Sequence, residues 1–240
     1  MKRGALLRIG GCAGLMFLVL NLVGQVSAFG ADAKVNDPIP TLTAYYANHR
    51  HQMFTSVIIL AAGAFFLMWF LGALYQLLRT PQDDGNPLPA VVLVAGAAAT
   101  SMFLLERMPQ AILAVMAGQP GGLSDGLAVR ALSDMQGVLT SAFIMTLAVL
   151  TPAIAAALVR RGLAGAWLAW LGGISAALFL ASGLAGYTTI DNDTWDNVLH
   201  LADLGAYIVV VVAAIVLIRA PGSGVARVAT ASASAPVTAA

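Results

Sequence analysis

The chain has 240 residues, of which 60% are hydrophobic and only 10% are charged, and its mean hydropathy is +0.86. A soluble domain carries about 25% charged residues, so this composition indicates a surface that faces lipid. The net charge of +1 gives no reason to expect a nucleic-acid partner. Cys12 is the only cysteine, which excludes an intrachain disulfide.

Six apolar stretches are each long enough to span a bilayer, since one span needs about 20 residues. They lie at residues 4–28, 53–78, 89–117, 135–159, 163–187 and 198–218. We therefore expect an all-α, polytopic transmembrane bundle of six helices that forms a single domain over residues 1–219. Residues 220–240 have neither periodicity nor core residues, so we expect a disordered cytoplasmic tail there.

The first stretch allows two interpretations. A basic start, an apolar core and the small residues Val26-Ser27-Ala28 fit a cleaved secretory signal. The core is long for a signal peptide and five further spans follow, which favours a retained first helix. The other five helices keep the same orientation in either case.

Basic residues are concentrated in every second one of the segments that flank and separate the apolar stretches. One set of gaps carries Lys2, Arg3, Arg8, Arg79, Arg160, Arg161, Arg219 and Arg227, and the other set carries only Lys34, Arg50, Arg107 and Arg130. By the positive-inside rule, both termini lie in the cytoplasm. Among the carboxylates, only Asp83 and Asp84 then fall inside, and all three histidines lie at or beyond the outer face.

Residues 36–40 are helix breakers, and from Thr41 or Thr43, either of which can cap a helix, the chain runs without a breaker into the second span. Such a helix would have about 38 residues and a length of ~57 Å, whereas the hydrocarbon core is ~30 Å thick. We expect the helices of the second to fourth spans to extend beyond the outer face. The apolar run after Pro109 is either a kinked extension of the third span or an interfacial segment, and Asp125 opens the next helix.

The last span carries a polar face. Asp196, His200, Asp203 and Tyr207 stand at i, i+4, i+7 and i+11 and therefore share one side of a helix. Two interpretations of this face are open. Its side chains either titrate a proton or bind a cation at a site open to the outside, or they only form a polar stripe where the end of the helix reaches water. His200 and Asp203 are only weak metal candidates, because two ligands on one helix do not define a site.

A second polar face comprises Arg130, Asp134, Gly137 and Ser141, and the third span adds Glu106 and Arg107. Adjacent helix residues point in different directions, so Glu106 and Arg107 need not pair with each other, and we expect an interhelical ion pair of Arg107 with Asp134 or Asp203. We hypothesise that the residues of these polar faces line one outward-facing polar pocket. Its candidate residues are Glu106, Arg107, Arg130, Asp134, Asp196, His200, Asp203 and Tyr207.

Two aromatic stretches carry a family resemblance. They are the segment from Ala44 to Arg50, followed by Trp69-Phe70-Leu71-Gly72-Ala73-Leu74, and the segment from Gly165 to Gly172. In these stretches the chain resembles an uncharacterised group of multi-pass integral membrane proteins, mostly from high-GC Gram-positive bacteria. The resemblance implies a small helical bundle in the bacterial plasma membrane, and it implies no activity and no catalytic residues.

Three functions stay open from the sequence. The first is a plasma-membrane protein whose pocket binds, or helps to move, a small solute, lipid or ion. The second is an intramembrane enzyme, with or without a metal, that uses Asp134, His200 and Asp203 as acid, base or metal ligands. The third is a structural or accessory subunit of a membrane complex. No Walker loop, zincin motif or nucleophile elbow is present, so no catalytic residue and no cofactor is assigned.

Overall fold

The structure is a computed structural model that describes residues 3–28, 37–79, 85–188 and 193–220, with the backbone alone for residues 3 and 28 and within 186–197. This part of the chain is all helical. Six helices in it are long and apolar enough to cross a membrane, and one further helix, α2, is short. The helices are α1 (Arg3–Ala28), α2 (Ile39–Asn48), α3 (Arg50–Leu78), α4 (Leu88–Met116), α5 (Gly126–Arg160), α6 (Ala166–Thr188) and α7 (Asp193–Arg219).

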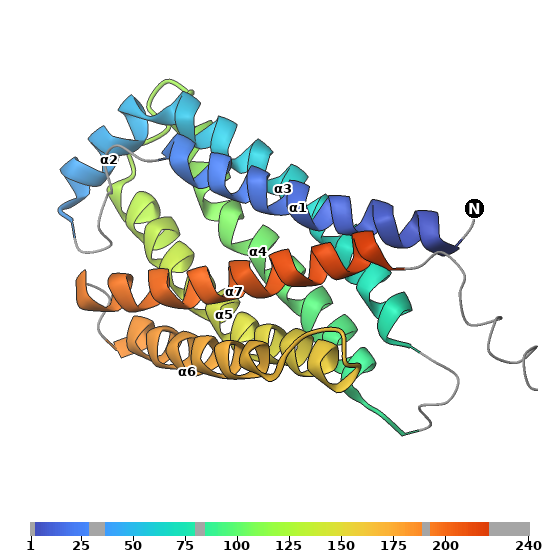
Figure 1. Ribbon diagram of the computed structural model, residues 1–240. Coiled ribbons are helices and arrows are strands. Elements are labelled where there is room, and N and C mark those ends of the chain that lie inside the picture. Colours follow the sequence, from blue (N-terminus) through green and yellow to red (C-terminus); the bar gives the residue numbers. More distant parts are fainter. Residues whose placement is uncertain (1–2, 29–36, 80–84, 189–192, 221–240) are drawn as a thin grey trace, which may run out of the picture.

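The six long helices form a closed ring (Figure 1). Going round it, α1, α3, α4, α5, α6 and α7 each pack against the next, and α7 returns to pack against α1. In this order α4 and α7 occupy opposite positions. Further contacts of α7 with α3 and α5 cross the ring.

Small residues bring the ring helices into close contact, as they do in many membrane bundles. A Cβ atom added at Gly11 would lie 2.6 Å from the carbonyl oxygen of Ala214, so α1 and α7 touch through backbone there. A Cβ atom at Gly205 would lie 2.0 Å from the hydroxyl of Ser175, which brings α7 against α6. These two positions close the ring around α7.

The two ends of the bundle differ in charge and packing. The arginine-rich end, as we call it, carries Arg8, Arg79, Arg160, Arg161 and Arg219, and the helices there enclose an apolar core that includes Phe70, Leu74, Ile154 and Leu158. The opposite end carries α2 and is called the α2 end (Figure 1). Buried polar side chains concentrate toward the α2 end, as described below.

The expected continuous helix into the second span is wrong. Backbone angles of −108° and 13° at His49 separate α2 from α3, and α2 begins after Pro38 without a threonine cap. The reason is tertiary packing, since Leu42 and Tyr46 of α2 are buried in a cluster with Leu113 and Val129. To lie against α4 and α5 in this way, α2 must leave the axis of α3.

Other boundaries agree with the sequence. The side chain of Asp125 accepts hydrogen bonds from the backbone amides of Leu127 and Ala128, so it caps α5 as expected. Of the two alternatives for the segment after Pro109, the continuous helix is correct, because α4 runs through this proline to Met116. The expected tail at residues 220–240 lies outside the described residues except for Ala220.

Candidate polar site at the α2 end

Glu106 lies at the centre of the polar residues at this end. It is only 2% exposed, and its Oε1 atom lies 2.8 Å from the Nη2 atom of Arg107. The expected pairing of Arg107 with another helix is therefore wrong. Although adjacent residues diverge on a helix, the flexible arginine side chain curves back, and its guanidinium also lies over the ring of Phe103.

Several buried polar atoms around Glu106 lack hydrogen bonds within the described part of the chain. They are Nε of Arg107, Oε1 of Gln110 and the two oxygens of Glu106, although Oε1 of Glu106 keeps its ion pair with Arg107. Gln110 follows Glu106 by one helical turn and is 6% exposed. More than 90% of buried polar groups in proteins are hydrogen-bonded, so a cluster of exceptions needs a cause such as bound water, an ion or a ligand.

Helices α5 and α7 bring further polar groups to Glu106. The hydroxyl of Thr140 on α5 lies beside its carboxylate, and Asp203 on α7 lies within electrostatic range of it. Asp203 is half-buried and interacts electrostatically with His200, whose own side chain is exposed. The structure therefore brings together residues of α4, α5 and α7 that the sequence places far apart.

Helix α1 contributes two polar residues that the sequence analysis missed. The hydroxyl of Tyr207 donates to Oδ1 of Asn21 at 3.0 Å, and Nε2 of Gln25 donates to the same oxygen at 2.7 Å. Gln25 lies 3.3 Å from the Tyr207 hydroxyl as well. The available signal was two amides spaced i, i+4 in an apolar run, which predicts that they share a helix face.

We call these residues the Glu106 cluster. It comprises Asn21, Gln25, Glu106, Arg107, Gln110, Thr140, Asp203 and Tyr207. If both of its carboxylic acids ionise, one guanidinium cannot neutralise them, and Asp203 makes no ion pair with any described residue. Charge interactions are strong where water is scarce, so the cluster favours a proton or a small cation as the missing positive charge.

Two predicted site residues serve another purpose. Nε of Arg130 lies 3.1 Å from Oδ1 of Asp134, one turn along α5, and its Nη1 atom donates to the backbone oxygen of Asp37 at 3.0 Å. This pair thus fastens the segment that precedes α2 to α5. The side chain of Asp196 lies outside the described residues.

The same region holds a buried tyrosine on α2. Tyr46 is 4% exposed, and its hydroxyl is hydrogen-bonded to the Ser133 side chain of α5. Burial raises the pKa of Tyr46 above its ordinary value, and the Ser133 hydrogen bond offsets part of that increase. Tyr46 and Ser133 therefore hold α2 over the N-terminal part of α5.

A metal centre is not evident in the described residues, because no three His, Cys, Asp or Glu side chains gather there. His200 and Asp203 lie on the same helix, and among the described residues no third side chain of these kinds joins them. Comparison of the chain with protein-family models, with curated proteins and with solved structures gave no match. What can be said of function therefore depends on the geometry and charge of the Glu106 cluster.

Proposed function

We propose that this chain is a membrane protein that binds a small cation, or a small polar solute with a positive charge, at the Glu106 cluster. The observation that supports this proposal best is Glu106 itself. Its carboxylate is 2% exposed and is paired with Arg107, but it also lies near the second acid Asp203, so the described residues leave a negative charge in the bundle that a cation or a proton would offset.

The distribution of polar groups favours binding over passage through the bundle. The cluster occupies the half of the bundle nearer α2, whereas apolar residues such as Phe70, Val92 and Ile154 fill the core nearer the other end. A conducting path needs polar or hydrated groups across the whole bilayer. The arrangement fits a site that loads and empties from one side.

The charge of the two ends supports an outward-facing site. Arginines gather at the end opposite to the cluster, and the positive-inside rule assigns such an end to the cytoplasm. Both termini are then cytoplasmic and the cluster faces the outside of the plasma membrane. The resemblance to bacterial membrane proteins is in keeping with this location. A fluorescent protein fused after Ala240 should fluoresce in cells, and a periplasmic reporter there should stay inactive.

Thermal unfolding of the purified protein in detergent tests the binding. Na⁺, K⁺, choline and methylammonium are added as chlorides, with N-methylglucamine keeping the ionic strength constant. At ~100 times its Kd, a bound cation stabilises the folded state by about 2.7 kcal/mol, which raises the Tm by several degrees.

The carboxylate variants identify the site. We expect the cation-induced rise to disappear in Asp203→Asn and Glu106→Gln. It should persist in Asp134→Asn, because this carboxylate is at the same end but pairs with Arg130. The proposal fails if none of these cations stabilises the wild-type protein, or if Asp134→Asn abolishes the effect as completely as Asp203→Asn.

A further inference from the structure

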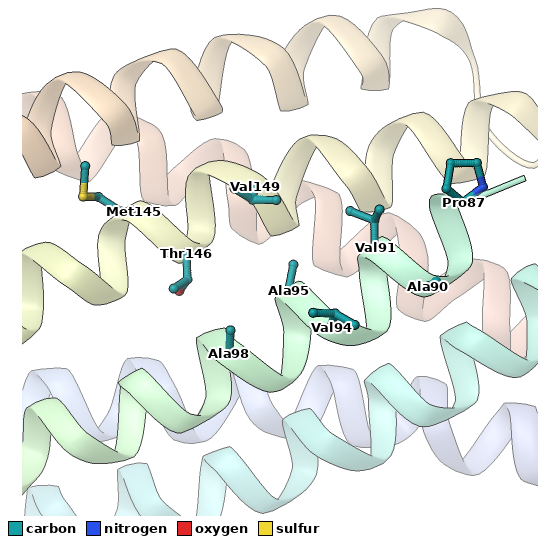
Figure 2. A pocket seen from close by; sticks show the side chains of 9 residues that line it. All are labelled: Pro87, Ala90, Val91, Val94, Ala95, Ala98, Met145, Thr146 and Val149. Carbon is teal, nitrogen blue, oxygen red and sulfur yellow. The ribbon is translucent and has the colours of Figure 1, made fainter.

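An apolar groove lies between α4 and α5 toward the arginine-rich end, away from the Glu106 cluster (Figure 2). Its volume is about 560 Å³. The only hydroxyl that lines it, on Thr146, already donates to the backbone oxygen of Phe143 at 2.6 Å. The groove therefore offers no free hydrogen-bonding group to a polar ligand.

Small side chains on α4 create this groove and leave it open to the surroundings of the bundle. Ala90, Ala95 and Ala98 line it, and Figure 2 shows Ala95 and Ala98 pointing toward α5. At its edges Val94 is 68% exposed and Val149 is 52% exposed. On a helix that spans a membrane, exposed apolar surface of this kind faces lipid chains rather than water.

The length of the groove fits one lipid leaflet. Its lining on α4 extends from Pro87, at the start of the helix, to Ala98. Eleven residues at 1.5 Å each give ~16 Å, which is about half of the ~30 Å hydrocarbon core. An extended acyl chain that begins at the arginine-rich end would therefore fill the groove to its inner limit.

Charge at the open end of the groove indicates what kind of lipid occupies it. Arg160 follows Val149 by eleven residues, or about three helical turns, so both lie on the same face of α5. Arg160 is exposed and lies in the last turn of α5, which ends at the same arginine-rich end where α4 and the groove begin. Guanidinium groups bind phosphate with paired, charge-assisted hydrogen bonds.

From these observations we propose that the α4–α5 groove binds one acyl chain of an anionic glycerophospholipid, whose phosphate and headgroup contact Arg160. The lipid belongs to the leaflet at the arginine-rich end. Anionic lipids and basic residues near a membrane surface attract one another by about 1 kcal/mol per residue, which corresponds to about fivefold in affinity. This inference is independent of the Glu106 cluster and of what that cluster binds.

Native mass spectrometry of the detergent-purified protein tests the proposal. The protein is mixed with equal amounts of phosphatidylglycerol and phosphatidylcholine that carry the same acyl chains. We expect wild-type protein to retain one phosphatidylglycerol molecule. Arg160→Gln should reduce its preference for phosphatidylglycerol about fivefold. Ala98→Phe should release the retained lipid, because the ring occupies the groove.

Two control variants separate the groove from general effects. Ala97 is exposed and adjacent to Ala98 but does not line the groove, so Ala97→Phe should keep the lipid. Arg8 lies at the same end on α1, so Arg8→Gln should keep the preference for phosphatidylglycerol. If Ala98→Phe does not fold, the comparison of lipid preference between Arg160→Gln and Arg8→Gln still tests the proposal.

Three results would overturn the proposal. The first is equal lipid retention by Ala98→Phe and Ala97→Phe, both folded. The second is an unchanged lipid preference in Arg160→Gln. The third is a wild-type dimer that Ala98→Phe converts to monomer without loss of lipid, since a second copy of the chain would then cover the groove.

Discussion

At the scale of single residues, most of the buried polar atoms that lack hydrogen bonds in the described structure lie in the Glu106 cluster, and one further such atom is Oδ1 of Asp134. Glu106, Arg107 and Gln110 are buried or half-buried on α4 and have atoms without hydrogen bonds in the described structure. By contrast, Asn21 and Tyr207 use their polar atoms in hydrogen bonds between α1 and α7. Satisfied groups of this second kind hold helices together, whereas the first kind carries the proposal of a bound cation.

The Glu106–Arg107 pair predicts a non-additive mutational cycle. Removing one partner leaves the other charge uncompensated, so Glu106→Gln and Arg107→Gln should each lower the free energy of unfolding by about 3 kcal/mol. The double variant Glu106→Gln/Arg107→Gln removes both charges and should therefore lose much less stability than the sum of the two single variants. Unfolding in mixed micelles by titration with dodecyl sulfate measures these values. Additive losses would show that the two side chains do not act as a pair.

Tyr46 predicts a loss of stability in alkali. Burial raises its pKa above the ordinary value of 10.0, so the unfolded chain ionises first. The stability that the neutral phenol provides is complete below pH 10.0 and is lost as the pH rises through the folded-state pKa. Melting curves from about pH 9 to 11 should show a smaller decrease in Tm for Tyr46→Phe than for wild type. Ser133→Ala keeps the buried phenol and should retain the alkaline decrease. If the Tm of Tyr46→Phe decreases over this pH range as much as that of the wild type, groups other than Tyr46 cause the alkaline decrease.

At the scale of secondary-structure elements, local signals and tertiary packing compete. The cap at Asp125 follows from local chemistry and is placed correctly by the sequence, and the turn at Gly162, where φ is +66°, uses the residue type that favours this backbone angle. The break at His49 does not, because no proline or glycine marks it. It exists because burying Leu42 and Tyr46 against α4 and α5 is worth more than continuing one helix into solvent.

The cap of α5 predicts a local effect. Asp125→Ala removes the acceptor of two backbone amides and should cost about 1 kcal/mol in stability. Hydrogen exchange should become faster at Leu127 and Ala128, while the core of α5 near Ile154 keeps its protection. Ser124→Ala is the matched control, since its hydroxyl bonds to Gly121 in the preceding turn and not to the helix. Equal effects of the two variants would contradict a capping role.

At the scale of the whole molecule, α1 closes the ring. It packs against both α3 and α7, and its Asn21 and Gln25 bind Tyr207. Phe17 and Leu18 of α1 are part of the largest core cluster. Removing α1 would therefore open the ring beside the Glu106 cluster and expose core residues such as Phe70.

This closure predicts the state of the N-terminal segment. Purified protein should contain residues 1–28, because a helix with these contacts is part of the fold, and intact-mass measurement checks this directly. A chain that starts after residue 28 should express at a lower level and unfold at a lower temperature. Detection of a stable protein that begins at residue 29 would instead support the cleaved-signal interpretation.

The sequence alone determined the class of the molecule, the six spans and most helix ends. These features depend on the length and polarity of contiguous segments, and contiguous segments are what a sequence displays. The sequence also named Glu106, Arg107, Asp203 and Tyr207. It could not determine that Arg107 turns to its neighbour, that Arg130 and Asp134 fasten the segment before α2, or that Asn21 and Gln25 meet Tyr207. Only the tertiary structure decided these pairings, because they depend on which helices adjoin in the ring and on how each is rotated about its axis.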